Sequence, residues 1–236
     1  MYDISISICV PAFNEEKTLA AAVEDLISTL SLLVRELEVI IVNDGSSDST
    51  STIAEDLASK NPQIKVINHK NNLGVGFAFR GALAKAKCQF FSWFPGDHEN
   101  SAQEFVQCLD YLSKDTLVTT HHQGYDNRSF MRRLISGAYT WILNKYFDLN
   151  LKYYNGLTIF PTEVLRSFPL VSNGFFFTAE SMIKAAKEGY KVIELSAPLK
   201  KRNWGKSKAL TPLSMIRLSR SFISILFKEG RGLRRR

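Results

Sequence analysis

Two short polar segments, each placed directly after an apolar run, constrain the fold of this chain more than any other feature. The first is VPAFNEE, residues 10–16, and the second is VNDGSSDST, residues 42–50. They are about one strand–helix–strand unit apart, so each is predicted to follow a strand of the same sheet. In an open α/β sheet, ligands bind beyond the carboxyl ends of the strands. The side chains expected to converge on one such pocket are Asn14, Glu15, Asp44 and Ser46.

Hydrophobic periodicity extends this unit into a βαβαβ order with a further helix and strand. The fourth strand is almost wholly apolar, which is typical of a strand buried on both faces of a parallel sheet. We therefore predict an α/β protein with a mostly parallel central sheet flanked by helices. The predicted elements are strands over residues 4–10, 38–43, 63–69 and 89–94, helices over about 16–33 and 50–60, and a glycine-containing loop that runs into a helix within residues 72–87.

The chain has the size and composition of one globular domain. It contains 236 residues, of which 45% are hydrophobic and 22% are charged, enough for a substantial core. No linker-like stretch, internal repeat or low-complexity tract divides it. We predict one domain over residues 1–210 and a tail over residues 211–236. The tryptophans are isolated from one another and are assigned packing roles: Trp93, Trp141 and Trp204.

The cysteines and the apolar runs favour a cytoplasmic location. Cys9, Cys88 and Cys108 are odd in number and far apart, and Cys9 lies in an apolar strand pattern. This usage favours buried thiols in a reducing compartment. The first residues alternate like a strand and do not resemble a signal peptide. Because no uncharged apolar run approaches the roughly 20 residues of a spanning helix, we do not expect the chain to cross a membrane unaided.

Basic residues are concentrated toward the C-terminus, and they account for much of the formal net charge of +7. Clustered cations suggest a polyanionic partner, such as a phosphate-bearing substrate, anionic lipid or nucleic acid. The tail places Leu213, Ile216, Ile223 and Phe227 on one approximate helical face bordered by basic residues. We predict a basic amphipathic helix that binds an anionic membrane surface, with contact in a homo-oligomer as the alternative. Nucleic acid is not expected as a partner, because no recognition motif appears.

The loop PGDHEN, residues 95–100, follows the fourth predicted strand and carries the strongest catalytic signal. Asp97 and Glu99 stand two residues apart, so their carboxylates can be directed at a hard divalent cation that also bridges substrate phosphates. The alternative is an ordinary acidic turn that caps the following helix at Ser101. The position directly after a buried strand favours the metal site.

These segments occur in the order and spacing of a known enzyme family, together with NLGVGFAFRGAL and RNWGKSK further along the chain. The chain resembles the family 2 glycosyltransferases of GT-A fold, over roughly residues 4–210. Within that family it is most similar to the dolichol-phosphate mannose synthase type, on the late residues Arg202, Gly205, Ser207 and Lys208. The resemblance implies a Rossmann-like GT-A domain with a nucleotide-sugar half, about residues 1–110, and an acceptor half, about residues 111–210.

The same resemblance implies an inverting transfer from a nucleotide diphosphate sugar. The family usually has two aspartates separated by one residue in the acidic loop, whereas this chain has Pro95 at the first position. Asp97 is then the implied ligand for Mg²⁺ or Mn²⁺, and Glu99 can supply a compensating oxygen. The implied donor-binding residues are Pro11, Ala12, Asn14, Glu15, Asp44, Gly76, Asp97, Arg202, Ser207 and Lys208.

Catalysis requires neutralisation of the departing diphosphate. A divalent ion can do this as a Lewis acid, and Arg202 or Lys208 on a late loop can add charge-assisted hydrogen bonds. A basic surface loop without a ligand is the alternative. Plain turns and helix caps are likewise the alternatives for the first two loops.

The acceptor half places arginines ahead of an apolar helix. Arg128 and Arg132 suit the head of a lipid phosphate beside an apolar surface, although a core helix with solvated arginines is the alternative. Asn155 resembles the acceptor-side turn of the family. Glu180 resembles its acidic residue near the acceptor and would act as base toward a hydroxyl. A polyprenyl phosphate already carries an anionic oxygen and needs no base, so Glu180 is otherwise a first-turn helix acid.

We therefore expect a peripheral enzyme on the cytoplasmic face of a membrane. It would transfer a sugar to a polyprenyl phosphate of dolichyl or undecaprenyl type, or to a related lipid acceptor of cell-envelope glycan synthesis. A glycosyltransferase with a soluble hydroxyl acceptor is the first alternative. The missing first aspartate motivates a second one, a catalytically silent relative that binds a nucleotide.

Overall fold

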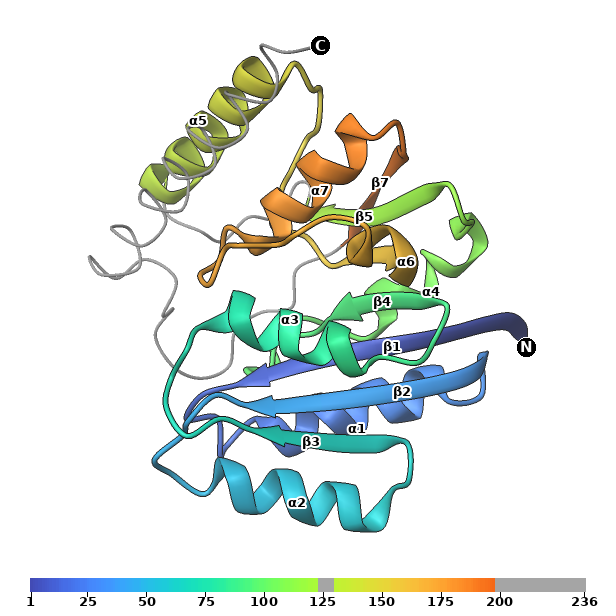
Figure 1. The fold of residues 1–236 in the computed structure, drawn as a ribbon, viewed down its shortest axis with the longest axis vertical. Helices are drawn as coiled ribbons and strands as arrows, with labels where there is room; N and C mark the ends of the chain where they lie inside the picture. Colours follow the sequence, from blue (N-terminus) through green and yellow to red (C-terminus); the bar gives the residue numbers. More distant parts are fainter. Residues whose placement is uncertain (123–129, 198–236) are drawn as a thin grey trace.

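Seven strands form one sheet in the part of the chain that the computed structural model describes, residues 1–122 and 130–197. The strand order is β3-β2-β1-β4-β6-β5-β7 (Figure 1). Strand β6 is antiparallel to both of its neighbours, β4 and β5, and the other pairs are parallel. The carboxyl ends of the other strands therefore lie at one edge of the sheet, and the predicted mostly parallel α/β fold is confirmed.

The structure gives the bounds of each element. The strands are β1 (Tyr2–Ala12), β2 (Val34–Asn43), β3 (Ile64–Asn68), β4 (Phe90–Trp93), β5 (Thr116–His122), β6 (Thr158–Pro161) and β7 (Lys191–Ala197). The helices are α1 (Leu19–Leu30), α2 (Thr50–Lys60), α3 (Val75–Lys85), α4 (Gln103–Val106), α5 (Phe130–Phe147), α6 (Thr162–Arg166) and α7 (Phe177–Lys187), with a 3₁₀ turn η1 (Leu109–Tyr111).

The predicted starts of α1 and β2 are wrong for physical reasons. Helix α1 begins at Leu19, three residues later than predicted, because Asn14 has a left-handed φ of 54° and the residues after it form turns. Strand β2 begins at Val34, four residues earlier than predicted, because this part of the strand pairs with the start of β1. Its exposed charged residues, Arg35 and Glu36, hide that pairing from a hydrophobicity pattern.

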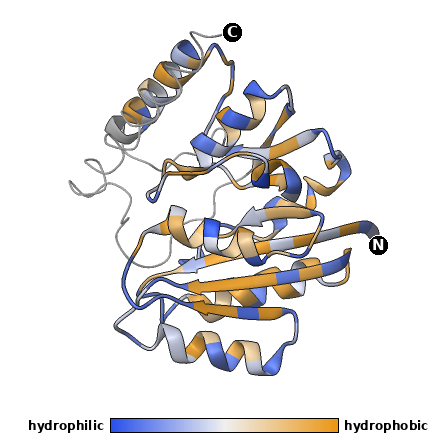
Figure 2. Ribbon diagram, viewed as in Figure 1, coloured by the Kyte–Doolittle hydropathy of each residue, from blue (hydrophilic) through white to orange (hydrophobic). Residues whose placement is uncertain are grey.

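Helices cover both faces of the parallel part of the sheet (Figure 1). Helix α3 packs on β1 and β2 from one side, while α1 packs on β2 and on α2 from the other. The central strands are apolar along their length (Figure 2), and residues 39–42 of β2 are fully buried without a break. Burial on both faces explains why these strands show continuous apolar runs instead of alternation.

Helix α5 lies outside these layers, at the end of the molecule that carries α7 (Figure 1). Leu143 and Phe147 are buried on its inner face, and the Tyr139 ring makes edge-on contacts with Tyr154 and Phe176. Trp141, on the outer face, is 67% exposed. The packing role predicted for Trp141 is therefore wrong, whereas Trp93 is buried as expected.

The sequence predicts that the cysteines are buried and reduced. Cys9, Cys88 and Cys108 are buried and not in disulfides, as predicted. Burial raises the pKa of each of these thiols, to about 12 for Cys108.

Within residues 1–122 and 130–197, no helix combines the length and the apolar character needed to span a bilayer. The predicted amphipathic tail lies outside the described residues.

Candidate functional site

The loops that follow β1 and β2 are joined by hydrogen bonds between their side chains and backbones. Asn14 donates its N–H to Ser46 Oγ at 3.0 Å and accepts the Ser47 N–H on its side-chain oxygen at 2.9 Å. The Glu15 N–H is bound to Thr50 Oγ1 at 2.8 Å. These bonds bring VPAFNEE and VNDGSSDST together at the carboxyl edge of the sheet. Asn14, Glu15 and Ser46 thus lie on adjoining loops in the structure, whereas their convergence on one ligand pocket stays a prediction.

The carboxylate of Asp44 binds groups within the protein. It accepts hydrogen bonds from His69 Nδ1 at 2.7 Å, from the Leu73 N–H at 3.0 Å and from the Gly74 N–H at 2.8 Å. Asp44 is 3% exposed, so these donors replace the water that a buried carboxylate loses. Asp44 thereby fixes the loop that leads into α3. Its predicted contact with a base or ribose remains a prediction.

The acidic loop after β4 lies against the end of β1. The Phe94 N–H is bound to Cys9 O at 2.8 Å, and the Gly96 N–H to Pro11 O at 3.3 Å. A Cβ at position 96 would lie 3.1 Å from Pro11 O, so glycine permits this approach. The predicted donor-binding residues Pro11 and Ala12 are the last residues of β1, next to this loop. Three strands therefore deliver their loops to one place.

The acidic loop is held in shape by its own residues and by α1. Asp97 Oδ1 accepts the Glu99 N–H at 3.2 Å, and His98 has a left-handed φ of 54°. His98 Nε2 lies 3.4 Å from Asp25 Oδ2, which also accepts the Ala102 N–H at 3.1 Å. Asp97 and Glu99 thus stand on a constrained turn.

The carboxylate oxygens of this turn are candidate ligands for Mg²⁺ or Mn²⁺. Among the described residues, no group of three or more His, Cys, Asp or Glu side chains is placed to hold a metal ion. Mg²⁺ is usually bound by one or two carboxylates, waters and substrate phosphates, without a complete protein cage. Two carboxylates on one turn, Asp97 and Glu99, fit that partial role, and the described part of the chain holds no site that is complete without substrate.

Glycines at the start of α3 allow the loop between α6 and α7 to approach closely. The Gly76 N–H donates to Asn173 O at 2.8 Å, and a Cβ at position 76 would lie 2.1 Å from Ser172 O. Arg80 adds hydrogen bonds to Ser172 O at 2.6 Å and to Asn173 Oδ1 at 2.5 Å. Gly76 therefore joins the start of α3 to the loop between α6 and α7. Its predicted donor contact remains untested.

Glu180 holds the same loop from the other side. Its side chain is fully buried and accepts the N–H groups of Val171 and Ser172, each at 2.9 Å. Lys184 Nζ also lies 2.9 Å from its carboxylate. The sequence suggested a base or a first-turn helix acid, and the loop partners were missed because they arise from tertiary packing. The role of a base stays a prediction.

On the acceptor side, Asn155 joins the turn before β6 to α7, because its side-chain oxygen accepts the Thr178 hydroxyl at 3.1 Å. A Cβ at the following Gly156 would lie 1.8 Å from Thr120 O, so only glycine fits. Arg132 lies in the first turn of α5. The remaining predicted site residues lie outside the described residues: Arg128, Arg202, Ser207 and Lys208.

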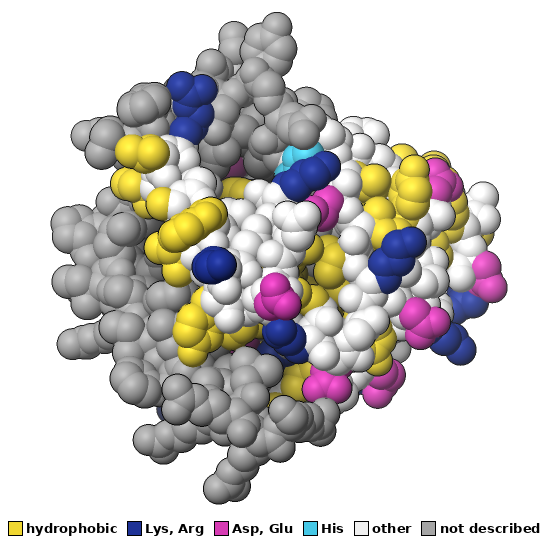
Figure 3. All heavy atoms as spheres, turned by 90° about the horizontal axis from the view of Figure 1, so that it is seen from above, with side chains coloured by type: hydrophobic (Ala, Val, Ile, Leu, Met, Phe, Trp, Pro, Cys, Tyr) yellow, Lys and Arg dark blue, Asp and Glu magenta, His cyan; other side chains and the backbone are white. Residues whose placement is uncertain are grey.

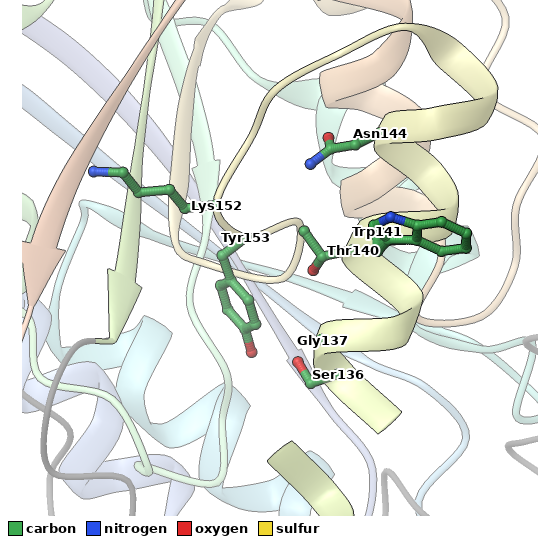
Figure 4. A pocket seen from close by; sticks show the side chains of 7 residues that line it. All are labelled: Ser136, Gly137, Thr140, Trp141, Asn144, Lys152 and Tyr153. Atoms are coloured by element: carbon green, nitrogen blue, oxygen red, sulfur yellow. The ribbon is translucent and has the colours of Figure 1, made fainter. Parts of the chain in front are cut away.

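An open groove of about 370 Å³ lies between α5 and the segment before β6 (Figure 4). Tyr153 is directed toward Ser136, while the Lys152 side chain extends away from the helix. The groove is lined by residues 136–153 and not by the junction of the three loops. Its lining residues are Ser136, Gly137, Thr140, Trp141, Asn144, Lys152 and Tyr153.

Comparison with known proteins identifies relatives that are similar in sequence. A dolichyl-phosphate β-glucosyltransferase, ALG5C of Trichomonas vaginalis, is 26% identical over 149 residues, which cover 56% of this chain and 44% of the relative. A chondroitin synthase of Escherichia coli is 29% identical over 136 residues, covering 58% of this chain and 19% of the relative. The chain thus spans less than half the length of these curated relatives.

Comparison with solved structures concerns the fold. Glucosyl-3-phosphoglycerate synthase of Mycobacterium tuberculosis, solved with Mn²⁺, UDP and phosphoglyceric acid, superposes with a TM-score of 0.68 at 19% identity. The superposition covers 92% of this chain and 76% of that protein. It confirms the predicted GT-A fold. The family model described as Glycosyl transferase family 2 matches residues 7–175, more than half of the sequence. The chain therefore belongs to glycosyl transferase family 2.

Proposed function

We propose that the protein transfers a sugar, with inversion, from a nucleotide diphosphate sugar to a polyprenyl phosphate or a related lipid phosphate. The observation that carries this proposal is the junction of the loops after β1, β2 and β4. There, Asn14 is bound to Ser46 and Ser47, and Gly96 is bound to Pro11. A crevice beyond the carboxyl ends of parallel strands is where α/β proteins bind nucleotides.

Donor binding is assigned to this junction, with Pro11, Ala12, Asn14, Glu15 and Asp44 on the nucleotide side. Asp97 and Glu99 would hold Mg²⁺ or Mn²⁺, which would supply Lewis-acid neutralisation of the diphosphate when bound. The solved relative of this fold that contains Mn²⁺ and UDP supports that assignment. Arg202, Ser207 and Lys208 are proposed to bind the same phosphates.

The arrangement around Glu180 supports a phosphate acceptor. Its carboxylate interacts with two backbone N–H groups and with Lys184, so it is poorly placed to collect a proton from a hydroxyl. A phosphate oxygen is already an anion and needs no general base. The similarity to a dolichyl-phosphate β-glucosyltransferase supports the same class of acceptor. Arg128, Arg132 and Asn155 are the proposed acceptor contacts.

A soluble acceptor is the second candidate. The solved structure with the same fold is a glucosyl-3-phosphoglycerate synthase that contains phosphoglyceric acid, which is not a lipid. Replacement of the first aspartate of the acidic loop by Pro95 also keeps a silent nucleotide-binding protein under consideration. From the sequence, we also propose that residues 211–236 attach the protein to the cytoplasmic face of a membrane. A homo-oligomer is proposed on the same basis.

A transfer assay tests the proposal. Purified protein is incubated with UDP- and GDP-sugars, Mg²⁺ or Mn²⁺, and either a short-chain polyprenyl phosphate or a soluble sugar or glycerate acceptor. We expect product on the lipid phosphate that disappears with EDTA. Transfer only to soluble hydroxyls would replace the lipid acceptor, and absence of any transfer by a folded protein that binds nucleotide would favour the silent relative.

A further inference from the structure

Helix α5 has two apolar stripes where a surface helix normally has one. The inner stripe contains Tyr139, Leu143 and Phe147 at helical spacing, and it packs against the domain. The outer stripe contains the exposed side chains Leu134, Ile135, Ala138, Trp141, Ile142 and Tyr146, also at helical spacing. Leu134 is 56% exposed and Trp141 is 67% exposed. The fold alone does not explain the second stripe.

The charges of α5 are all of one sign. Its sequence, FMRRLISGAYTWILNKYF, contains Arg132, Arg133 and Lys145 but no Asp or Glu. Arg133 and Lys145 are exposed near its two ends. Figure 3 looks onto this end of the molecule, and apolar side chains gather there along one flank together with Lys and Arg side chains. The stripe therefore combines large apolar side chains with positive charge.

From this combination, we propose that the outer face of α5 lies on an anionic lipid surface. Trp, Ile and Leu on one face, with cations beside them, are the features of a helix that lies in the membrane interface. Such a helix lies in the plane, which agrees with the finding that none of the described helices can span a bilayer. At 18 residues, α5 would extend about 27 Å along the surface. Lys145 can bury its alkyl chain and keep its ammonium at the lipid phosphates.

Charge disfavours two other occupants of this face. A second copy docked through α5 would bring Arg133 and Lys145 near the same cations of its partner, with no acid on the helix to pair with them. Residues 198–236 of this chain are also strongly basic, and Glu229 is their one acid. A partner with negative charge and an apolar layer satisfies both features of the stripe. An anionic bilayer is such a partner.

Docking through α5 would also orient the acceptor half. Asn144 binds the Leu151 backbone through both N–H and C=O, and its oxygen accepts the Tyr154 hydroxyl at 2.8 Å. Tyr139 contacts Tyr154 and Phe176. The helix is thus rigidly connected to the turn that carries Asn155. This orientation matters for catalysis only if the proposed lipid acceptor is correct, whereas the lipid contact itself does not depend on it.

Tryptophan fluorescence tests the contact directly. In a Trp204→Phe background, the remaining tryptophans are the buried Trp93 and the exposed Trp141. With vesicles of phosphatidylglycerol and phosphatidylcholine, we expect a blue shift and quenching by brominated lipid, and both should vanish when Trp141→Phe is added. Quenching that survives Trp141→Phe, or no quenching in the background protein, would overturn the inference.

Vesicle sedimentation of the full-length chain, without donor or acceptor, measures the partition coefficient between water and the lipid surface. Trp141→Glu and Lys145→Glu should each reduce the partition coefficient by about tenfold or more. The matched controls are Leu32→Glu, 81% exposed before β2, and Lys114→Glu, exposed before β5, which should bind like wild type. Wild-type binding by Trp141→Glu would contradict the inference. Failure of the unmodified chain to bind anionic vesicles would also overturn it and would leave an acidic protein as the partner.

The transfer assay separates this inference from the proposed function. Trp141→Glu should still transfer sugar to a short-chain polyprenyl phosphate in detergent, where no surface is required. A protein that binds vesicles through α5 but transfers no sugar contradicts the proposed function alone.

Discussion

The Nδ1 atom of His69 lies 2.7 Å from the carboxylate of Asp44, and both side chains are largely buried. This pair connects the end of β2 to the loop before α3, where the same carboxylate holds the N–H groups of Leu73 and Gly74. The wall of the proposed nucleotide crevice is therefore positioned by a histidine that the sequence motifs did not include.

Replacement of His69 by Ala should weaken donor binding. Loss of one charge-assisted hydrogen bond to a buried carboxylate costs about 1.5–3 kcal/mol, part of which should appear as a several-fold rise in KM for the donor. The turnover number should change less, because His69 is not placed at the reacting atoms. Steady-state kinetics against donor concentration measure this, with the exposed neighbour Lys70→Ala as control. A loss in kcat at unchanged KM would assign His69 a different role.

Glycine at position 76 should be required for the close packing of α3 against the loop between α6 and α7. A Cβ there would lie 2.1 Å from Ser172 O, and we expect Gly76→Ala to destabilise the protein by about 1–3 kcal/mol. Gly81 lies in the same helix, where a Cβ would meet only His69 Nε2 at 3.9 Å. Gly81→Ala should therefore be neutral or stabilising by about 0.5–1 kcal/mol. Urea unfolding measures both changes, and equal effects would contradict the close approach.

Glu180→Gln should reduce stability more than it reduces catalysis. It removes the charge that faces Lys184 in a buried pair, a change that typically costs about 3–5 kcal/mol. Lys184→Met in the same background should recover part of that loss. Under conditions where the variant is folded, we expect kcat to stay within about threefold. A fall of about 100-fold or more, with loss of the acidic limb of the pH profile, would instead identify Glu180 as a general base.

The sequence predicts the first half of the fold well because its information is local. The polar composition of residues 10–16 and 42–50, directly after apolar strands, indicates that these loops lie at the edge of the sheet. Asn14 is hydrogen-bonded to Ser46 there. The partners of Asp44 and Glu180 were missed, because hydrogen bonds to His69 or Ser172 depend on packing between distant segments. In α5, hydrophobic periodicity indicates a helix. Because the helix has two apolar stripes, the sequence does not show which of them packs against the core.

The buried thiols should make stability fall at high pH. Burial raises the pKa of Cys9 and Cys108 above the ordinary value of 9.0, so these thiols stay protonated in the folded state. In the unfolded chain they ionise above about pH 9, which favours unfolding as pH rises beyond that value. Urea midpoints between pH 8 and 10.5 should decline less in Cys9→Ala than in wild type, after correction for its cavity at pH 7. Rapid labelling of the native cysteines by a thiol reagent at pH 8 would contradict their burial.

The central claim is that loops from three strands form one nucleotide diphosphate site completed by a cation at Asp97. Calorimetric titration of UDP and of GDP into the protein, with and without Mn²⁺, tests this most directly. We expect one of the two to bind only with Mn²⁺, and Asp97→Asn to weaken that binding at least about tenfold, while the exposed Asp115→Asn binds like wild type. Equal Mn²⁺-dependent binding by Asp97→Asn, or no binding of either nucleotide to a well-folded protein, would contradict the account.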